Sequence, residues 1–246
     1  MDSESTSPKV PSRQTGALRL AGFCVAVVLT LYLAVAYLII PFGWTRYAKH
    51  HSTFDDNPRL TKTSDGHPGD PLNVGLIGTE TEVKDIMAAA QWFAANPLGL
   101  RSDLKIAADT VLKRSYDAAP VSSLFLFGRK EDLAFERPVG GDPSKRNHVR
   151  FWRTVRVNDD GRPIWIGSAS YDERVGLSHT TGQITHHIAS DVDVERDKLM
   201  TDLQQTNMLA DSYKVVGFHQ VLAGKNGGGD PWHTDGDLQV GVIDAK

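Results

Sequence analysis

Potential metal ligands and acid–base groups gather most densely in Gly182–Asp197, whose sequence is GQITHHIASDVDVERD. An alternating stretch typical of a strand ends in His186 and His187, and an acid-rich turn then opens a helix. Successive side chains of a strand point to opposite faces, so the two histidines point apart. The pattern favours a hydrogen-bonded core position for His186 and leaves His187 as the candidate ligand or proton carrier.

Three acids, Asp191, Asp193 and Glu195, fall at or within the first turn of the predicted helix. Negative side chains at this position interact with free N–H groups and with the helix dipole, each contributing about 0.3–1 kcal/mol. A structural role therefore accounts for these acids without a metal. The alternative is that Asp193 or Glu195 assists a neighbouring ligand site.

The predicted strand Asn147–Thr154 carries a second set of candidates. Alternation places His148, Arg150 and Trp152 on one face and the apolar Val149 and Phe151 on the other. A guanidinium group offers a planar fork to phosphate or carboxylate, and an imidazole offers a switchable donor. These two residues are candidates for binding an anion. The alternative is a solvent-exposed face whose arginine pairs with a surface carboxylate.

A metal site of mixed nitrogen and oxygen ligands would join His148, Asp172 and His187. Such ligands suit zinc, manganese or iron(II), and a bound ion would activate water for hydrolysis. The chain lacks the helical zinc motif HExxH, the phosphate-binding P-loop and the GxSxG nucleophile motif. Apart from a divalent metal, no cofactor is indicated. The glycines of Ala223–Gly229 predict a hairpin loop, and Asn158-Asp-Asp-Gly161 predicts the turn of another hairpin.

Composition narrows the class of protein. The 246 residues carry a formal net charge of -3. The chain therefore does not have the excess of basic residues that is typical of nucleic-acid-binding surfaces. The only cysteine, Cys24, lies in an apolar run. An intrachain disulfide and a thiolate metal site are therefore excluded.

The sequence of the N-terminal part predicts a disordered polar tail at residues 1–16 and a transmembrane helix at residues 17–44. Leu20–Ile40 has no charge and spans about 32 Å as a helix, enough to cross a bilayer. We therefore expect residues 20–40 to contact lipid. A cleaved signal peptide is the alternative, but the residues after the run are bulky where cleavage needs small ones. Basic residues flank both ends, and the short basic tail mildly favours a single-pass protein with an extracytoplasmic body.

The remaining chain predicts a linker at 45–70 and one folded domain at 71–246. A capping box at Thr79 and Glu82 begins one helix, and two more are expected at about 102–113 and 192–205. Alternating or apolar runs separated by turn residues predict the strands Asn73–Gly78, Ser123–Gly128, Leu133–Arg137, Asn147–Thr154, Ile164–Tyr171, Gln183–Ile188, Tyr213–Leu222 and Asp237–Ile243. The fold class is α+β, with a mostly antiparallel sheet and about three helices.

Four segments resemble the LssY-like C-terminal domain family: PLNVGLIGTE, SSLFLFGRKEDLAFERPVG, NHVRFWRT and TGQITHHIASDVDVERD. The resemblance covers about residues 70–218. In that family the domain is often an appendage of membrane proteins, some with phosphatase-type or transport-like membrane modules. Here one helix takes the place of those modules. The resemblance implies a membrane setting and supplies no mechanism.

Two functions from different classes follow. The first is a non-catalytic, membrane-anchored envelope module that binds an anionic ligand or a membrane protein partner near the bilayer. The alternative is a metal-dependent hydrolase acting on a phosphoester or lipid-like substrate.

Overall fold

The computed structural model describes residues 13–43, 54–95, 124–140, 145–180, 182 and 184–245. The chain divides into two compact units, Met1–His50 and His51–Lys246. Most of the predicted tail and the helix predicted at 102–113 lie outside the described residues.

The described part of the first unit is one long helix. It comprises α1 (Arg13–Ala34) and a π-helical turn η1 (Val35–Ile39), and it stays helical to Gly43. Its segment Arg19–Gly43 has 25 residues and is apolar enough to cross a membrane. A signal sequence can meet the same criteria of length and composition. The predicted apolar N-terminal helix is confirmed.

The second unit is built on an eight-stranded sheet. Seven strands follow the order β11-β14-β3-β9-β8-β7-β4, and β10 pairs with β9. Only β14 and β3 run parallel among these pairs. The predicted α+β class with mainly antiparallel sheets is therefore confirmed. The strands are β3 (Val74–Ile77), β4 (Phe93–Ala94), β7 (Leu133–Pro138), β8 (Arg146–Val157), β9 (Pro163–Leu177), β10 (Ile184–Ile188), β11 (Leu209–Val215) and β14 (Leu238–Ile243).

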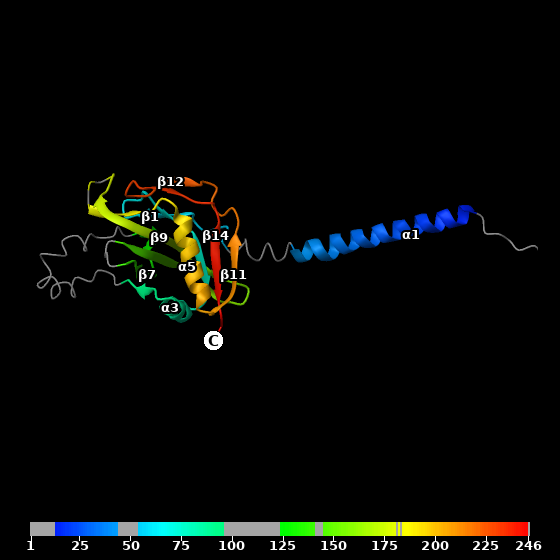
Figure 1. The fold of residues 1–246 in the computed structure, drawn as a ribbon, viewed down its shortest axis with the longest axis horizontal. Coiled ribbons are helices and arrows are strands. Elements are labelled where there is room, and N and C mark those ends of the chain that lie inside the picture. Colours follow the sequence, from blue (N-terminus) through cyan, green and yellow to red (C-terminus); the bar gives the residue numbers. More distant parts are fainter. Residues whose placement is uncertain are drawn as a thin grey trace, which may run out of the picture. The chain divides into compact units, whose positions relative to one another are not determined.

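Two helices, α3 (Glu80–Ala89) and α5 (Val192–Gln205), cover one face of this sheet (Figure 1). The predicted capping box begins α3: Thr79 Oγ1 accepts from the Glu82 N–H, and Glu82 Oε2 accepts from the Thr79 N–H. The core on this face joins apolar side chains of the helices to those of the sheet, among them Ile86, Met87, Leu199, Leu203, Val149, Phe151 and Ala169.

The opposite face of the sheet packs against a smaller, four-stranded sheet of order β2-β1-β5-β6. Its strands are β1 (Leu60–Thr63), β2 (Pro68–Pro71), β5 (Leu124–Leu126) and β6 (Arg129–Lys130). Folded structure therefore begins ahead of the boundary at residue 71 that the sequence suggested. Phe54 is fully buried against Leu72, Trp152 and Ile166, and burial of this ring ties part of the predicted linker to the domain.

Two predicted hairpins are present. Asn158 closes the turn between β8 and β9, because its side-chain oxygen accepts from the backbone N–H groups of Asp160 and Arg162. The glycine-rich segment joins β12 (Ala223–Lys225) to β13 (Pro231–His233). The strand predicted at Tyr213–Leu222 instead spans Leu209–Val215; Gly217 beyond it has φ 70°, which breaks the extended backbone.

Candidate functional site

A pocket of about 430 Å³, including space open to solvent, lies between the two sheets. The large sheet contributes polar side chains from β8, β9 and β10. The small sheet and the loop between β12 and β13 contribute the opposite wall. The lining residues are Thr63, Asp70, Leu124, His148, Arg150, Asp172, His186, Ile188, Asn226, Gly227 and Gly228.

Two neighbouring strands supply the polar residues in a matched register. On β8 and β9, Arg146 pairs with Asp172, His148 with Ser170, and Arg150 with Ser168. Directly opposed residues of a sheet share a face, so these six side chains form one polar stripe. The predicted alternation of β8 is confirmed, because Val149 and Phe151 pack in the core beneath the helices.

The carboxylate of Asp172 is the centre of this stripe. His148 Nδ1 lies 3.3 Å from Oδ1, and His186 Nδ1 lies 3.3 Å from Oδ2. Arg146 Nε donates to Oδ2 over 3.1 Å. Burial alone would raise the pKa of Asp172, but His148, His186 and Arg146 together hold it far below its ordinary value. Asp172 is therefore ionised and closely compensated.

The far nitrogen of each of these imidazoles lies beside an arginine. Arg150 Nη1 is 3.2 Å from His148 Nε2, and Arg146 Nη2 is 3.3 Å from His186 Nε2. A guanidinium group only donates, so these two contacts favour the tautomer in which Nε2 is free to accept and Nδ1, on the side of Asp172, carries the proton. Burial, opposed by Asp172, also lowers the pKa of His186.

The two arginines differ in how their charge is compensated. Arg146 has two close carboxylates, Asp172 at 3.1 Å and Glu136 at 3.2 Å. Arg150 is buried, with 8% exposure, and its ion pair with Asp70 is long at 3.8 Å. The sequence-based alternative of a solvent-exposed face does not describe Arg150, which lines the pocket.

The glycine-rich loop forms part of the pocket wall. Asn226 Nδ2 donates to Asp70 Oδ1 over 3.2 Å, which links the loop to β2. A side chain at Gly227 would meet Thr63 Cγ2 at 2.1 Å. A glycine is therefore needed at this position for the loop to lie against β1.

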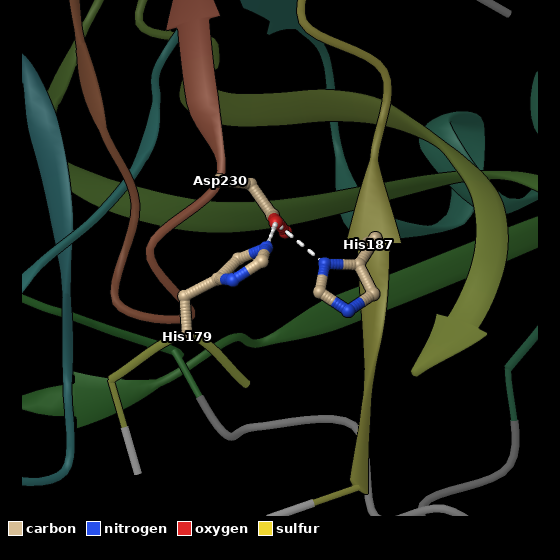
Figure 2. Close-up of side chains that lie close together, drawn as sticks. All are labelled: His179, His187 and Asp230. Carbon is tan, nitrogen blue, oxygen red and sulfur yellow. Dashed lines mark hydrogen bonds and ion pairs between the residues drawn. The ribbon is translucent and has the colours of Figure 1, made fainter. Parts of the chain in front are cut away.

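His187 points to a different cluster from the one predicted. Its Nδ1 is 2.5 Å from Oδ1 of Asp230, and His179 Nε2 is 4.0 Å from the same oxygen. Figure 2 shows the Asp230 carboxylate facing both rings. Of the predicted metal ligands His148, Asp172 and His187, the structure brings the first two together and puts His186 beside them.

The two predicted helix acids also lie apart from the pocket lining. Asp193 accepts from Arg196 Nη1 and Thr234 Oγ1, over 2.9 and 2.7 Å, in a network that ties α5 to Asp235. Glu195 is buried on α5, and burial raises its pKa to about 8. Their contacts agree with a structural role for Asp193 and leave Glu195 as a buried acid.

Sequence reasoning missed Asp70, Ser168, Ser170 and Arg146. The sequence held a signal for Ser168, Ser170 and Arg146. The two serines recur with Asp172 at every second residue of one strand. The neighbouring strand repeats this spacing with Arg146, His148 and Arg150. Asp70 had no such signal, since its segment was taken as linker.

The fold and the site define an α+β domain with a polar pocket between its two sheets, in a chain that also carries one long apolar N-terminal helix. The family model described as LssY C-terminus matches residues 54–238, and the chain belongs to this family. No curated protein and no solved structure was found to match the chain.

Proposed function

We propose that the chain is a single-pass, membrane-anchored binding module. Its pocket holds a small ligand through an anionic oxygen group, such as a phosphate. The long apolar helix supports the anchor, and the environment of Arg150 supports the ligand class.

The observation that carries this proposal is the incomplete compensation of Arg150. A buried charge is costly unless it is paired and hydrogen-bonded, yet its nearest ion-pair carboxylate among the described residues is 3.8 Å away. A phosphate or carboxylate entering the pocket would give the guanidinium group a close, bidentate partner. The neighbouring Arg146 already has two close carboxylate partners, so its charge is compensated without a ligand.

Two hydroxyl groups beside Arg150 favour the same ligand class. Ser168 and Ser170 are each 1% exposed, and their oxygens have no hydrogen-bond partner among the described residues. They oppose Arg150 and His148 across the sheet. The two serines are not among the residues that line the pocket. Because buried polar groups are normally hydrogen-bonded, we propose that a ligand oxygen reaches these unpartnered hydroxyl groups.

The acids of the pocket limit which anion fits. The charge of Asp172 is compensated by Arg146 and two imidazoles. Asp70 has an amide donor in Asn226 and only a long contact to Arg150. A ligand that presents a hydroxyl group next to its anionic group would suit Asp70 better than a bare anion. A glycerol phosphate headgroup has this chemistry.

The hydrolase alternative has less support. It needs His148, Asp172 and His187 on one ion, whereas His187 lies with Asp230. The Nε2 atoms of His148 and His186 are also within 3.3 Å of a guanidinium group, whose positive charge opposes a nearby divalent ion.

Titration calorimetry on the full chain in detergent tests the proposal, with inorganic phosphate and glycerol 3-phosphate as separate probes. We expect binding of both, tighter for glycerol 3-phosphate if a lipid headgroup is the source of the ligand. Equal affinities would indicate a free anion. Arg150→Gln should lower the affinity at least tenfold.

Arg153→Gln is the matched control, since this arginine lies on the same strand with an exposed side chain. It should bind as the unsubstituted chain does. A folded Arg150→Gln variant with unchanged affinity would overturn the proposed site. Unfolding of that variant would show that Arg150 is structural and would equally count against the proposal.

A further inference from the structure

A second cluster lies outside the residues that carry the proposed anion site. His179 follows β9, His187 lies on β10 and Asp230 precedes β13 (Figure 2). One potential ligand atom from each lies within 4.8 Å of the others. We propose that these three residues bind a divalent transition-metal ion of the zinc type.

The two separations from Asp230 are close to those an ion requires, and the two imidazole nitrogens lie within 4.8 Å of each other. Zinc bonds of about 2.0–2.2 Å place two tetrahedral ligands about 3.3 Å apart. Asp230 Oδ1 is 2.5 Å from His187 Nδ1 and 4.0 Å from His179 Nε2. The first distance must widen and the second shorten, each by under about 1 Å. The ion takes the position of the proton between His187 and Asp230.

The electrostatics of Asp230 favour a cation. The residue is 4% exposed, and its ion-pair partners among the described residues are the two imidazoles. A buried carboxylate usually has a charged partner or a metal. His187 Nε2 is also buried without a hydrogen-bond partner in the described part of the chain. Apart from Asp230, no group in that part of the chain determines which ring nitrogen of His187 carries the proton.

The backbone holds the three ligands in place. Asn226 Oδ1 accepts from the N–H of Asp230 over 2.9 Å, and the N–H of Ile188 donates to Asp230 Oδ2 over 3.4 Å. The N–H of His179 donates to the carbonyl of Gly228 over 2.9 Å. Gly229 has φ 87°, and a side chain there would meet His179 Cβ at 2.7 Å. A glycine is thus needed where the loop approaches His179.

The ligand set selects the kind of metal. Two imidazole nitrogens and one carboxylate oxygen suit zinc, cobalt(II) or iron(II), whereas magnesium and calcium prefer oxygen ligands alone. The side chain of His179 is 61% exposed, so an ion reaches the cluster from solvent. Three protein ligands leave a position for water. The ion would also cross-link the turn after β9, strand β10 and the glycine-rich loop.

The test uses the full chain in detergent, purified without a polyhistidine tag and stripped of metal. Calorimetry with zinc should show one tight site per chain, and cobalt(II) should give the visible absorption of a low-symmetry site. Zinc should also raise the melting temperature. His179→Gln removes an exposed ligand with little risk to the fold, and it should weaken zinc binding by at least about tenfold.

The matched control is His67→Gln, a second exposed histidine outside the cluster. It should keep the zinc affinity of the unsubstituted chain, as should Arg150→Gln if it folds, which separates this site from the anion pocket. Absence of zinc binding would overturn the proposal, leaving a hydrogen bond between His187 and Asp230. Equal binding by His179→Gln and the unsubstituted chain would overturn it too, since the ion would then lie elsewhere.

Discussion

Arg146 and Asp172 oppose each other across β8 and β9, and the arginine Nε donates to Oδ2 of the carboxylate over 3.1 Å. The same carboxylate faces the Nδ1 atoms of two imidazoles. One nearly fully buried acid therefore orients three cationic or donor side chains at the pocket, and its removal should affect all three.

Asp172→Ala should lower the free energy of unfolding by about 3–5 kcal/mol, because it leaves two buried imidazoles without their carboxylate and Arg146 with Glu136 alone. Denaturant unfolding of the full chain, followed by tryptophan fluorescence, measures the change. Asp65→Asn, in an exposed turn, is the control and should change stability by less than about 0.5 kcal/mol. A fully stable Asp172→Ala variant would show that Asp172 does not hold these side chains.

Glu195 should make the domain less stable as the pH rises. Burial raises its pKa to about 8, above the ordinary value of about 4.3. The folded state thus keeps its proton after the unfolded state has lost it. Stability is highest below about pH 4 for this group and falls by up to about 1.4 kcal/mol per unit toward pH 8. Denaturant midpoints measured across this range test the slope.

Glu195→Gln should remove that slope and raise the stability at pH 8. Glu173→Gln, whose side chain is exposed, should retain the slope and serves as the control. If the stability of Glu195→Gln changed with pH as steeply as that of the unsubstituted chain, another group would be responsible for the pH dependence.

Replacement of both Ser168 and Ser170 by alanine should leave the ligand-free domain within about 1 kcal/mol of its original stability. Their hydroxyl groups have no hydrogen-bond partner among the described residues, so their loss breaks no bond. The same variant should bind glycerol 3-phosphate more weakly. Thermal unfolding and calorimetry measure the two effects on one sample.

Thr61→Val is a contrasting control for the serine variants. Thr61 is a buried residue whose hydroxyl donates to the carbonyl of Asp70 over 2.9 Å, and its loss should cost about 1 kcal/mol. If the double serine variant is destabilised by several kcal/mol, its hydroxyl groups have structural partners and the pocket argument fails.

The apolar helix should remain on the mature protein and hold it in the membrane fraction. Leu20–Ile40 is uncharged and followed by bulky residues, which disfavours cleavage. Mass spectrometry of protein extracted from membranes should find the N-terminal segment intact. Deletion of residues 1–43 should release the domain to the soluble fraction. A mature chain that begins after residue 40 would identify a signal peptide instead.

Local patterns predicted the elements whose residues interact with near neighbours. The capping box at Thr79 and Glu82 forms as expected, and so does the Asn158 turn. The alternation of β8 correctly assigned Val149 to the core and His148 to the polar face. Each of these depends on the geometry of a single helix turn, hairpin or strand.

Long-range pairing was the part that sequence reasoning could not supply. Alternation separated His186 from His187 correctly, yet it could not say which of them faces Asp172. That choice depends on the register between β9 and β10, which shifts between His187 and Ile188. The approach of His179 to Asp230 depends on a loop distant in the sequence. Phe54 was likewise assigned to a linker because its partners lie far along the chain.

The parallel pairing of β3 and β14 also constrains how the protein is made. These strands are neighbours in the sheet, although one ends at Ile77 and the other begins at Leu238. The central sheet therefore cannot close until the ribosome has made the chain as far as β14, and such distant pairings form slowly. The apolar helix emerges long before that point. Delivery of the nascent chain to the membrane can thus precede closure of the domain, and a premature stop before β14 would leave its core open.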